Sequence, residues 1–182
     1  MEVLGMKLGS VLKTFMDEVG WKEQIEVSDD GNAARVMVKF GVANQPYGLF
    51  LETDERAEIF TVTAVSPFNV PPARMADMSR ILNRLNCRLT IGRLYCWDDE
   101  DANPVIFQQA IDMEGAKLVP KQIHILIGAA TGGFLEGRAA LLAAVALTQQ
   151  PIDALWAEHV AQDAGQQETS AAEEEQAGPT EL

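Results

Sequence analysis

Residues 78–97 read MSRILNRLNCRLTIGRLYCW, and this stretch decides the fold. Its first half spaces apolar residues as one stripe of an amphipathic helix, whereas Leu89 to Trp97 has the pattern of a strand. Asn86 lies between the two halves, and asparagine commonly ends a helix in the left-handed conformation. We therefore expect a helix that stops near Asn86 and leads directly into a strand.

The chain before this unit predicts one helix and two hairpins. Apolar residues recur every three or four positions over 3–19, which indicates a helix, and Gly20 is a typical end for it. The period then changes to two, as in strands. The first hairpin is expected over 24–28 and 35–40, and the second over 47–53 and 57–65. Residues 66–72 read as a stiff connector, and a new helix is expected from about Pro72.

The second hairpin is predicted to have one apolar and one mixed face. With its turn near Glu55, the core pairs would be Leu49 with Val62 and Leu51 with Phe60. Phe50 and Ile59 would then lie on the outer face among polar residues. They could form a partner-binding patch. Alternatively, a helix or a dimer mate covers them, or the register differs by one residue and the faces are exchanged.

Arg80, Arg84 and Arg88 recur at every fourth position, so they share one face of the expected helix. An arginine face can accept the carboxylates of a partner or another anionic ligand. It can equally be a solvated face that pairs with acidic residues of the same chain. Both interpretations remain open from the sequence.

The chain after this unit is expected to hold a strand over 105–113 and a long helix from Pro120. The acidic turn 98–101 lacks the alternating ligands, the central glycine and the distal glutamate of a calcium loop, so a solvated hairpin tip is favoured. Residues 128–133 read GAATGG, but Phe134 and Leu135 replace the lysine and hydroxyl residue of a phosphate loop. The glycines permit close approach of another backbone, or they break the helix near Gly132.

Composition limits the function classes. The formal net charge is −13, and residues 163–182 contribute six carboxylates and no base. This balance disfavours nucleic acid and anionic membranes as partners. Cys87 and Cys96 are expected to be free thiols, and no metal or cofactor site is predicted. We expect a domain over 1–150, a short docked helix over 151–162 that packs through Trp156, and a disordered acidic tail over 163–182 in a cytoplasmic protein.

Three landmarks carry a resemblance to a known family. They are the helix end Ile81-Leu82-Asn83-Arg84-Leu85-Asn86, the run Arg88-Leu89-Thr90-Ile91-Gly92, and the hairpin end Ile111-Asp112-Met113-Glu114-Gly115. In this order the chain resembles the YbjN-type family, which is similar in fold to class I type III secretion chaperones. The resemblance covers roughly 1–147. It implies an α+β domain in the order helix, strands, helix, two strands, helix, with an antiparallel sheet. It also implies a homodimer, a peptide-binding or regulatory role and no known catalytic residues.

The functional expectation is therefore a non-enzymatic chaperone or adaptor. It would hold a partner protein or peptide against exposed sheet and helix surfaces, with Phe50 and Ile59 as tentative contacts. The alternative is a regulator that senses an anionic ligand through Arg80, Arg84 and Arg88. An enzyme would need a thiol of Cys87 or Cys96 brought to His124, and nothing local activates either thiol.

Overall fold

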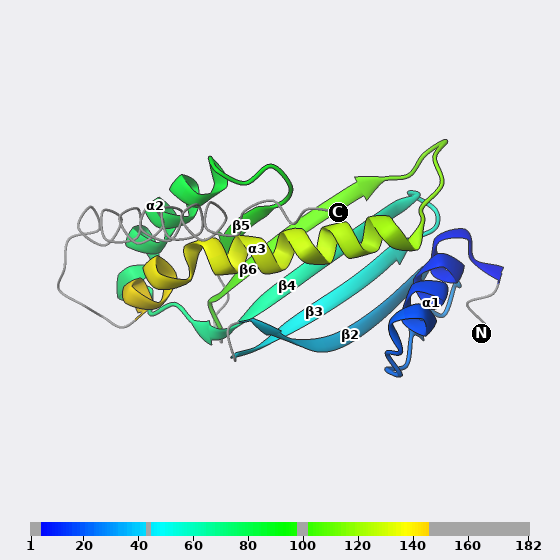
Figure 1. Ribbon diagram of the computed structural model, residues 1–182, viewed down its shortest axis with the longest axis horizontal. Coiled ribbons are helices and arrows are strands. Elements are labelled where there is room, and N and C mark those ends of the chain that lie inside the picture. Colours follow the sequence, from blue (N-terminus) through cyan, green and yellow to red (C-terminus); the bar gives the residue numbers. More distant parts are fainter. Residues whose placement is uncertain (1–4, 43–44, 98–101, 146–182) are drawn as a thin grey trace, which may run out of the picture.

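The computed structural model describes residues 5–42, 45–97 and 102–145. Within them the chain forms helices packed on an antiparallel sheet, which confirms the α+β expectation (Figure 1). The helical elements are α1 (Lys7–Val19), the 3-10 turn η2 (Pro72–Arg74), α2 (Met75–Asn86) and α3 (Pro120–Val145). The strands are β1 (Glu26–Val27), β2 (Ala33–Val42), β3 (Gln45–Asp54), β4 (Ile59–Asn69), β5 (Arg93–Cys96) and β6 (Pro104–Asp112). They lie in the order β1-β2-β3-β4-β6-β5.

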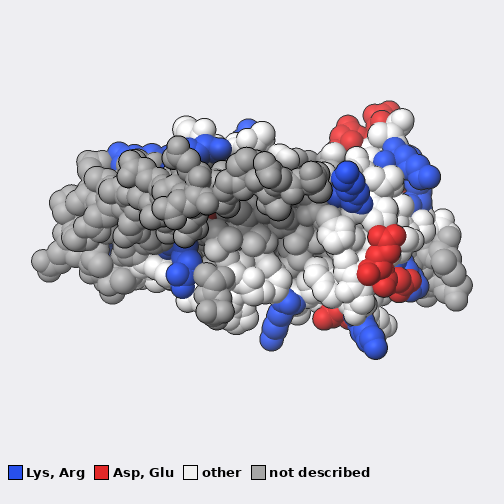
Figure 2. All heavy atoms as spheres, viewed as in Figure 1, with Lys and Arg blue, Asp and Glu red and all other residues white. Residues whose placement is uncertain are grey.

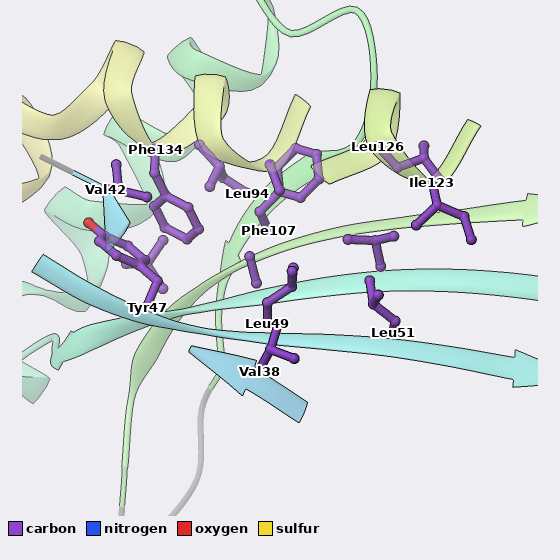
Figure 3. Packing of buried hydrophobic residues seen from close by; sticks show 14 of the residues in the cluster. Val38, Val42, Tyr47, Leu49, Leu51, Leu94, Phe107, Ile123, Leu126 and Phe134 are labelled. Carbon is purple, nitrogen blue, oxygen red and sulfur yellow. The ribbon is translucent and has the colours of Figure 1, made fainter. Parts of the chain in front are cut away.

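The core lies between α3 and one face of the sheet. Figure 1 shows α3 crossing the strands, with α1 and α2 near its two ends. Ile123, Leu126 and Phe134 of α3 point toward the strands in Figure 3. The strand residues beneath them are fully buried: Val36, Val38, Leu49, Leu51, Phe60, Val62, Ala64 and Phe107. Alternate residues of each strand thus supply one continuous apolar layer.

The β3–β4 register differs from the predicted one by two residues. Leu51 lies opposite Val62 rather than Phe60, because the turn occupies four residues after Asp54. Glu58 adopts a positive φ of 51° in this turn. A shift of two residues leaves every side chain on its predicted face, since the strand period is also two. The core face and the outer face are therefore confirmed, while the pairing is corrected.

The predicted connector after residue 65 is instead the end of β4. Continuing the β3–β4 register beyond Gly48 and Val65 would place Pro46 opposite Pro67. Neither proline has a backbone N–H, so the ladder cannot continue there. The pairing of β4 with β6 shifts in the same region, between Val65 and Asn69.

Asn86 ends α2, but not in the way predicted. The following residue, Cys87, keeps a right-handed φ of −67°, so no left-handed cap forms. Instead the Asn86 side chain bonds the backbone of Leu94: its Oδ1 accepts from the amide N–H at 2.7 Å, and its Nδ2 donates to the carbonyl at 2.8 Å. The strand is also shorter than predicted, because it begins at Arg93 after the positive φ of Gly92. Asn86 therefore joins α2 to β5.

The glycine-rich α3 is one continuous helix, and two of its glycines permit close packing. A Cβ at Gly133 would lie 3.2 Å from the Phe107 ring, and one at Gly137 would collide with the Leu85 side chain. Of the two interpretations of these glycines, the structure therefore selects close approach of a neighbouring element rather than a break near Gly132. The GAATGG run is helical, so it forms no phosphate-binding loop.

Glu55, in the β3–β4 turn, holds the start of α1. Its carboxylate accepts hydrogen bonds from the backbone N–H of Leu8 at 2.8 Å and of Gly9 at 2.7 Å. These are among the first N–H groups of the helix, which have no partner within it. The other end of α1 terminates as predicted, with Gly20 at a φ of 73°.

Three expectations concern residues outside the described ranges: the acidic turn 98–101, the helix 151–162 and the tail 163–182. In the ranges that are described, no helix is long and apolar enough to cross a membrane. The same ranges contain no cluster of three or more histidine, cysteine or acidic side chains that could hold a metal ion.

Candidate binding surface

The sheet face opposite α3 carries side chains in rows that cross five strands. One row contains Met37, Phe50, Thr63, Gln108 and Arg93. The next contains Lys39, Gly48, Val65, Ile106 and Tyr95. Neighbouring strands lie about 4.8 Å apart, so each row is about 19 Å long. We call this surface the open face.

Phe50 is at the centre of the open face. The guanidinium carbon of Arg35 lies 4.4 Å from the centroid of its ring, which is a cation–π arrangement. Arg35 also forms an ion pair with Glu52, with its Nε 3.4 Å from the carboxylate. On its other side the Phe50 ring leans over Gly48, where a Cβ would lie 3.7 Å from it. The glycine thus leaves room for an aromatic ring to lie flat along the strand.

The hollow over Phe50 on the open face measures about 350 Å³. Its walls come from β2, β3, β4, β6 and the β5 end, and include Tyr95, Trp97 and Ile106. Trp97 is 50 % exposed, whereas Ile106 is only 7 % exposed despite lying on this face. Burial raises the pKa of the Tyr95 hydroxyl above its usual value, so this group stays neutral. The hollow therefore combines aromatic walls with one arginine–glutamate pair.

Of the two predicted patch residues, only Phe50 lines this hollow. Ile59 shares its face but pairs with Asp54, four residues further along β3, or about 13 Å away. The structure therefore does not bring the two side chains together. Sequence reasoning missed Tyr95, Trp97 and Ile106. The alternation of side chains along β5 and β6 indicates which residues share a face. It assigns these three residues to the hollow only when the strand order is known.

The predicted arginine face is partly occupied by the chain itself. The Nε atom of Arg88 lies 2.7 Å from the Glu136 carboxylate of α3. Arg80 is exposed and Arg84 is half-buried on α2. The interpretation that these arginines pair with the chain's own acids thus holds for Arg88.

The two edges of the sheet differ. At the β5 edge, the Asn86 amide occupies the backbone groups of Leu94 as a neighbouring strand would. At the other edge, Ser28 N–H bonds the Ala33 carbonyl, so odd-numbered residues of β2 direct their backbone groups outward. β1 pairs only with Ala34 and Arg35. The described ranges show no backbone partner for Met37, Lys39 and Gly41 on this side, so the β2 edge can accept another strand.

The structure does not bring Cys87 to His124, as one of the thiol–histidine pairs considered for an enzyme would need. Cys87 lies next to Arg88, which contacts Glu136, whereas His124 lies three helical turns earlier in α3, about 18 Å away. The His124 ring packs edge-on against Phe15, with centroids 4.9 Å apart. Cys87 and Cys96 form no disulfide, as predicted.

A scan against protein-family models matches residues 9–142, well over half of the chain, to YbjN, described as "Putative bacterial sensory transduction regulator". The chain belongs to the YbjN family. The family expected from the sequence is therefore confirmed, and its description names a regulator rather than an enzyme. A search of the curated proteins found no match.

A search of the solved structures found these three among its matches. One is entitled "Crystal structure of YbjN, a putative transcription regulator from E. coli", with 12% identity and a TM-score of 0.50 over 71% of this chain and 90% of that chain. The ExsC–ExsE complex matches with 14% identity and a TM-score of 0.44 over 71% and 91%. The HopA1–SchA chaperone–effector complex matches with 15% identity and a TM-score of 0.44 over 75% and 96%. At these identities the likeness concerns the fold alone.

Proposed function

We propose that this YbjN family member is a non-enzymatic adaptor that binds an extended segment of a partner protein on the open face. The observation that supports this most is the hollow of about 350 Å³ over Phe50, which offers aromatic and aliphatic walls. Large apolar side chains on a solvent-facing sheet surface are typical of protein-binding sites. The β2 edge next to Met37 offers backbone groups to which a further strand of the partner could add.

The segment that fits has alternating large apolar residues. In an extended chain, every second side chain points the same way, so one set would enter the hollow near Trp97 and Ile106. The Arg35–Glu52 pair beside Phe50 would orient polar groups at the margin, because it offers both a donor and an acceptor.

Selection from a peptide library with the purified full-length protein tests this proposal. We expect peptides with alternating apolar residues, and at least about tenfold weaker binding by Phe50→Asp, because the carboxylate would be desolvated in the hollow. Ala110→Asp is the matched control: it places the same charge on the same face, outside the hollow, and should bind as wild type. Peptides that bind both variants equally would refute the proposal.

A second copy of the chain is the competing occupant of this face. Sedimentation of wild type and Phe50→Asp distinguishes the two. A wild-type dimer that Phe50→Asp converts to a monomer, without any peptide binding by wild type, would assign the open face to homodimerisation instead.

A second candidate function is a regulator that senses an anionic ligand through the α2 arginines. The exposure of Arg80 on α2 favours it. Calorimetry with nucleotides and phosphorylated metabolites tests it, and absence of heat at millimolar ligand would end it.

A further inference from the structure

The α2 end of the molecule is basic although the whole chain is acidic. Residues 74–88 contain four arginines (Arg74, Arg80, Arg84, Arg88) and a single carboxylate, Asp77, which pairs with Arg74, whereas the chain has a net charge of −13. Figure 2 shows basic side chains along the margin near α2, whereas the opposite end, around α1, carries both acidic and basic side chains. A concentrated basic surface on an acidic protein attracts acidic segments selectively.

An apolar cleft lies beside these arginines. It measures about 290 Å³ and lies between the α2–β5 connection and α3. Leu89, Ile91 and Ala129 contribute apolar walls, and Gly132 leaves space, since nothing lies within 4 Å of the position its Cβ would take. The Arg88–Glu136 ion pair forms the rim. The surface thus combines an apolar floor with basic surroundings.

The chain beyond Val145 has the complementary composition. Residues 146–182 contain eight carboxylates and no lysine or arginine. Ile152, Leu155 and Trp156 follow a helical spacing within this acidic segment, so it offers an apolar anchor as well as charge. An indole ring between carboxylates matches an apolar cleft that has Arg88 at its rim and lies beside α2.

The segment is also within reach of this surface. α3 packs beside α2 at its end, where Gly137 meets Leu85, and the segment starts nine residues later. With random-coil dimensions, a stretch of the length from Val145 to Asp163 would span about 21–25 Å on average, and α2 is about 18 Å long. Tethering at this length raises the local concentration of the acidic segment to the millimolar range.

We propose that the C-terminal segment of this chain docks on its own α2–α3 surface. Trp156 occupies the cleft beside Gly132, and the carboxylates of residues 163–175 lie against the arginines of α2. Docking on this side is independent of the open face, so it does not depend on the proposed adaptor function. An acidic partner or an anionic ligand would have to displace the segment to reach the arginines.

Paramagnetic relaxation tests the position of the segment in the full chain. A nitroxide on Cys87, in a Cys96→Ser background, should attenuate the amide signals of residues 163–175. A nitroxide on α1, at Lys13→Cys in a chain without the two native thiols, should leave them intact. Adding about 0.5 M salt should restore the signals with the Cys87 label, because the screening length falls well below 10 Å. Equal attenuation from both labels, or none from Cys87, would overturn the proposal.

The cleft is tested by a pair of glycine substitutions. Gly132→Leu fills the cleft, so it should restore the signals of residues 163–175 and move the Trp156 side-chain signal. Gly128→Leu adds the same side chain one turn earlier, where the space is also empty, and should change neither. Both variants should fold, since leucine favours a helix more than glycine does. Identical spectra of the two variants would remove the cleft from the docking surface.

A mixed sample distinguishes an intramolecular contact from one between copies. Isotope-labelled chains without nitroxide are combined with unlabelled chains that carry it on Cys87. The proposal expects no attenuation in this sample. If the signals are attenuated in the mixed sample as strongly as in chains that carry both the isotope label and the nitroxide, the segment docks on a second copy. This result would overturn the proposal.

Discussion

The two faces of the sheet are built by the same strands but have opposite properties. On the α3 side, Leu51, Val62 and Phe107 are completely buried. On the open face, their immediate neighbours Glu52, Thr63 and Gln108 remain accessible and form polar contacts such as the 3.3 Å bond from Gln108 to Thr63. Because the strand period is two, stability and recognition can be encoded in alternate residues of one segment. Substitutions on the two faces should therefore separate the two properties.

The largest effect is expected at Phe107. Its ring fills the space left by Gly92 and Gly133, so Phe107→Ala should lower the free energy of unfolding by about 3–5 kcal/mol. The neighbour on the open face, Gln108→Ala, should change it by less than about 0.5 kcal/mol. Urea denaturation measures both. Equal losses at the two positions would contradict the division between the faces.

Substitution of Asn86 tests the contact that joins α2 to the β5 edge of the sheet. Asn86→Ala leaves the amide and carbonyl of buried Leu94 without their side-chain partners, which should cost about 1–3 kcal/mol. Asn83, an exposed asparagine one turn earlier in α2, is the matched control and should tolerate alanine within about 0.5 kcal/mol. Thermal denaturation of the two variants decides whether the side-chain bridge stabilises the fold.

Substitutions of two glycines of α3 test how closely this helix must pack on the core side of the sheet. Gly137→Ala should destabilise the protein by about 1–2 kcal/mol, because its methyl group would displace Leu85 in a packed core. Gly128→Ala should instead stabilise it by up to about 1 kcal/mol, since that position is open and alanine favours a helix. Changes of the same sign would show that helix propensity, not packing, controls α3.

The smallest effect is expected at Asp30, which lies in a turn outside both faces. Hydrogen bonds from Asn32 and Ser28 lower the pKa of its carboxyl group from 3.8 to about 2. A lowered folded-state pKa stabilises the protein above pH 3.8, and this contribution disappears as the pH falls through about 2. The melting temperature of Asp30→Asn should therefore lie slightly below that of wild type at neutral pH and converge with it near pH 2. A constant difference across this range would rule out the carboxylate as the cause.

Local patterns predicted the elements and the faces well, because alternation and helical spacing depend on near neighbours. They identified the core side of Leu49 and Leu51, the end of α1 at Gly20 and the outward position of Phe50. They failed where distant contacts decide. The Leu51–Val62 pairing depended on the turn length, and the role of Asn86 depended on Leu94. The hollow over Phe50 combines five strands, so neither Tyr95 nor Trp97 could be assigned to it before the strand order was known.

The Glu55 cap also bears on the order in which the chain folds. α1 has 13 residues, and a helix of this length is only marginally stable alone. The carboxylate that completes its first turn lies 46–47 residues further along the chain, in the turn between β3 and β4. We therefore expect the hairpin to form before α1 becomes stable, so that substitutions within α1 mainly accelerate unfolding and leave the folding rate nearly unchanged. In kinetic terms, the first helix in the sequence is among the last elements to be completed.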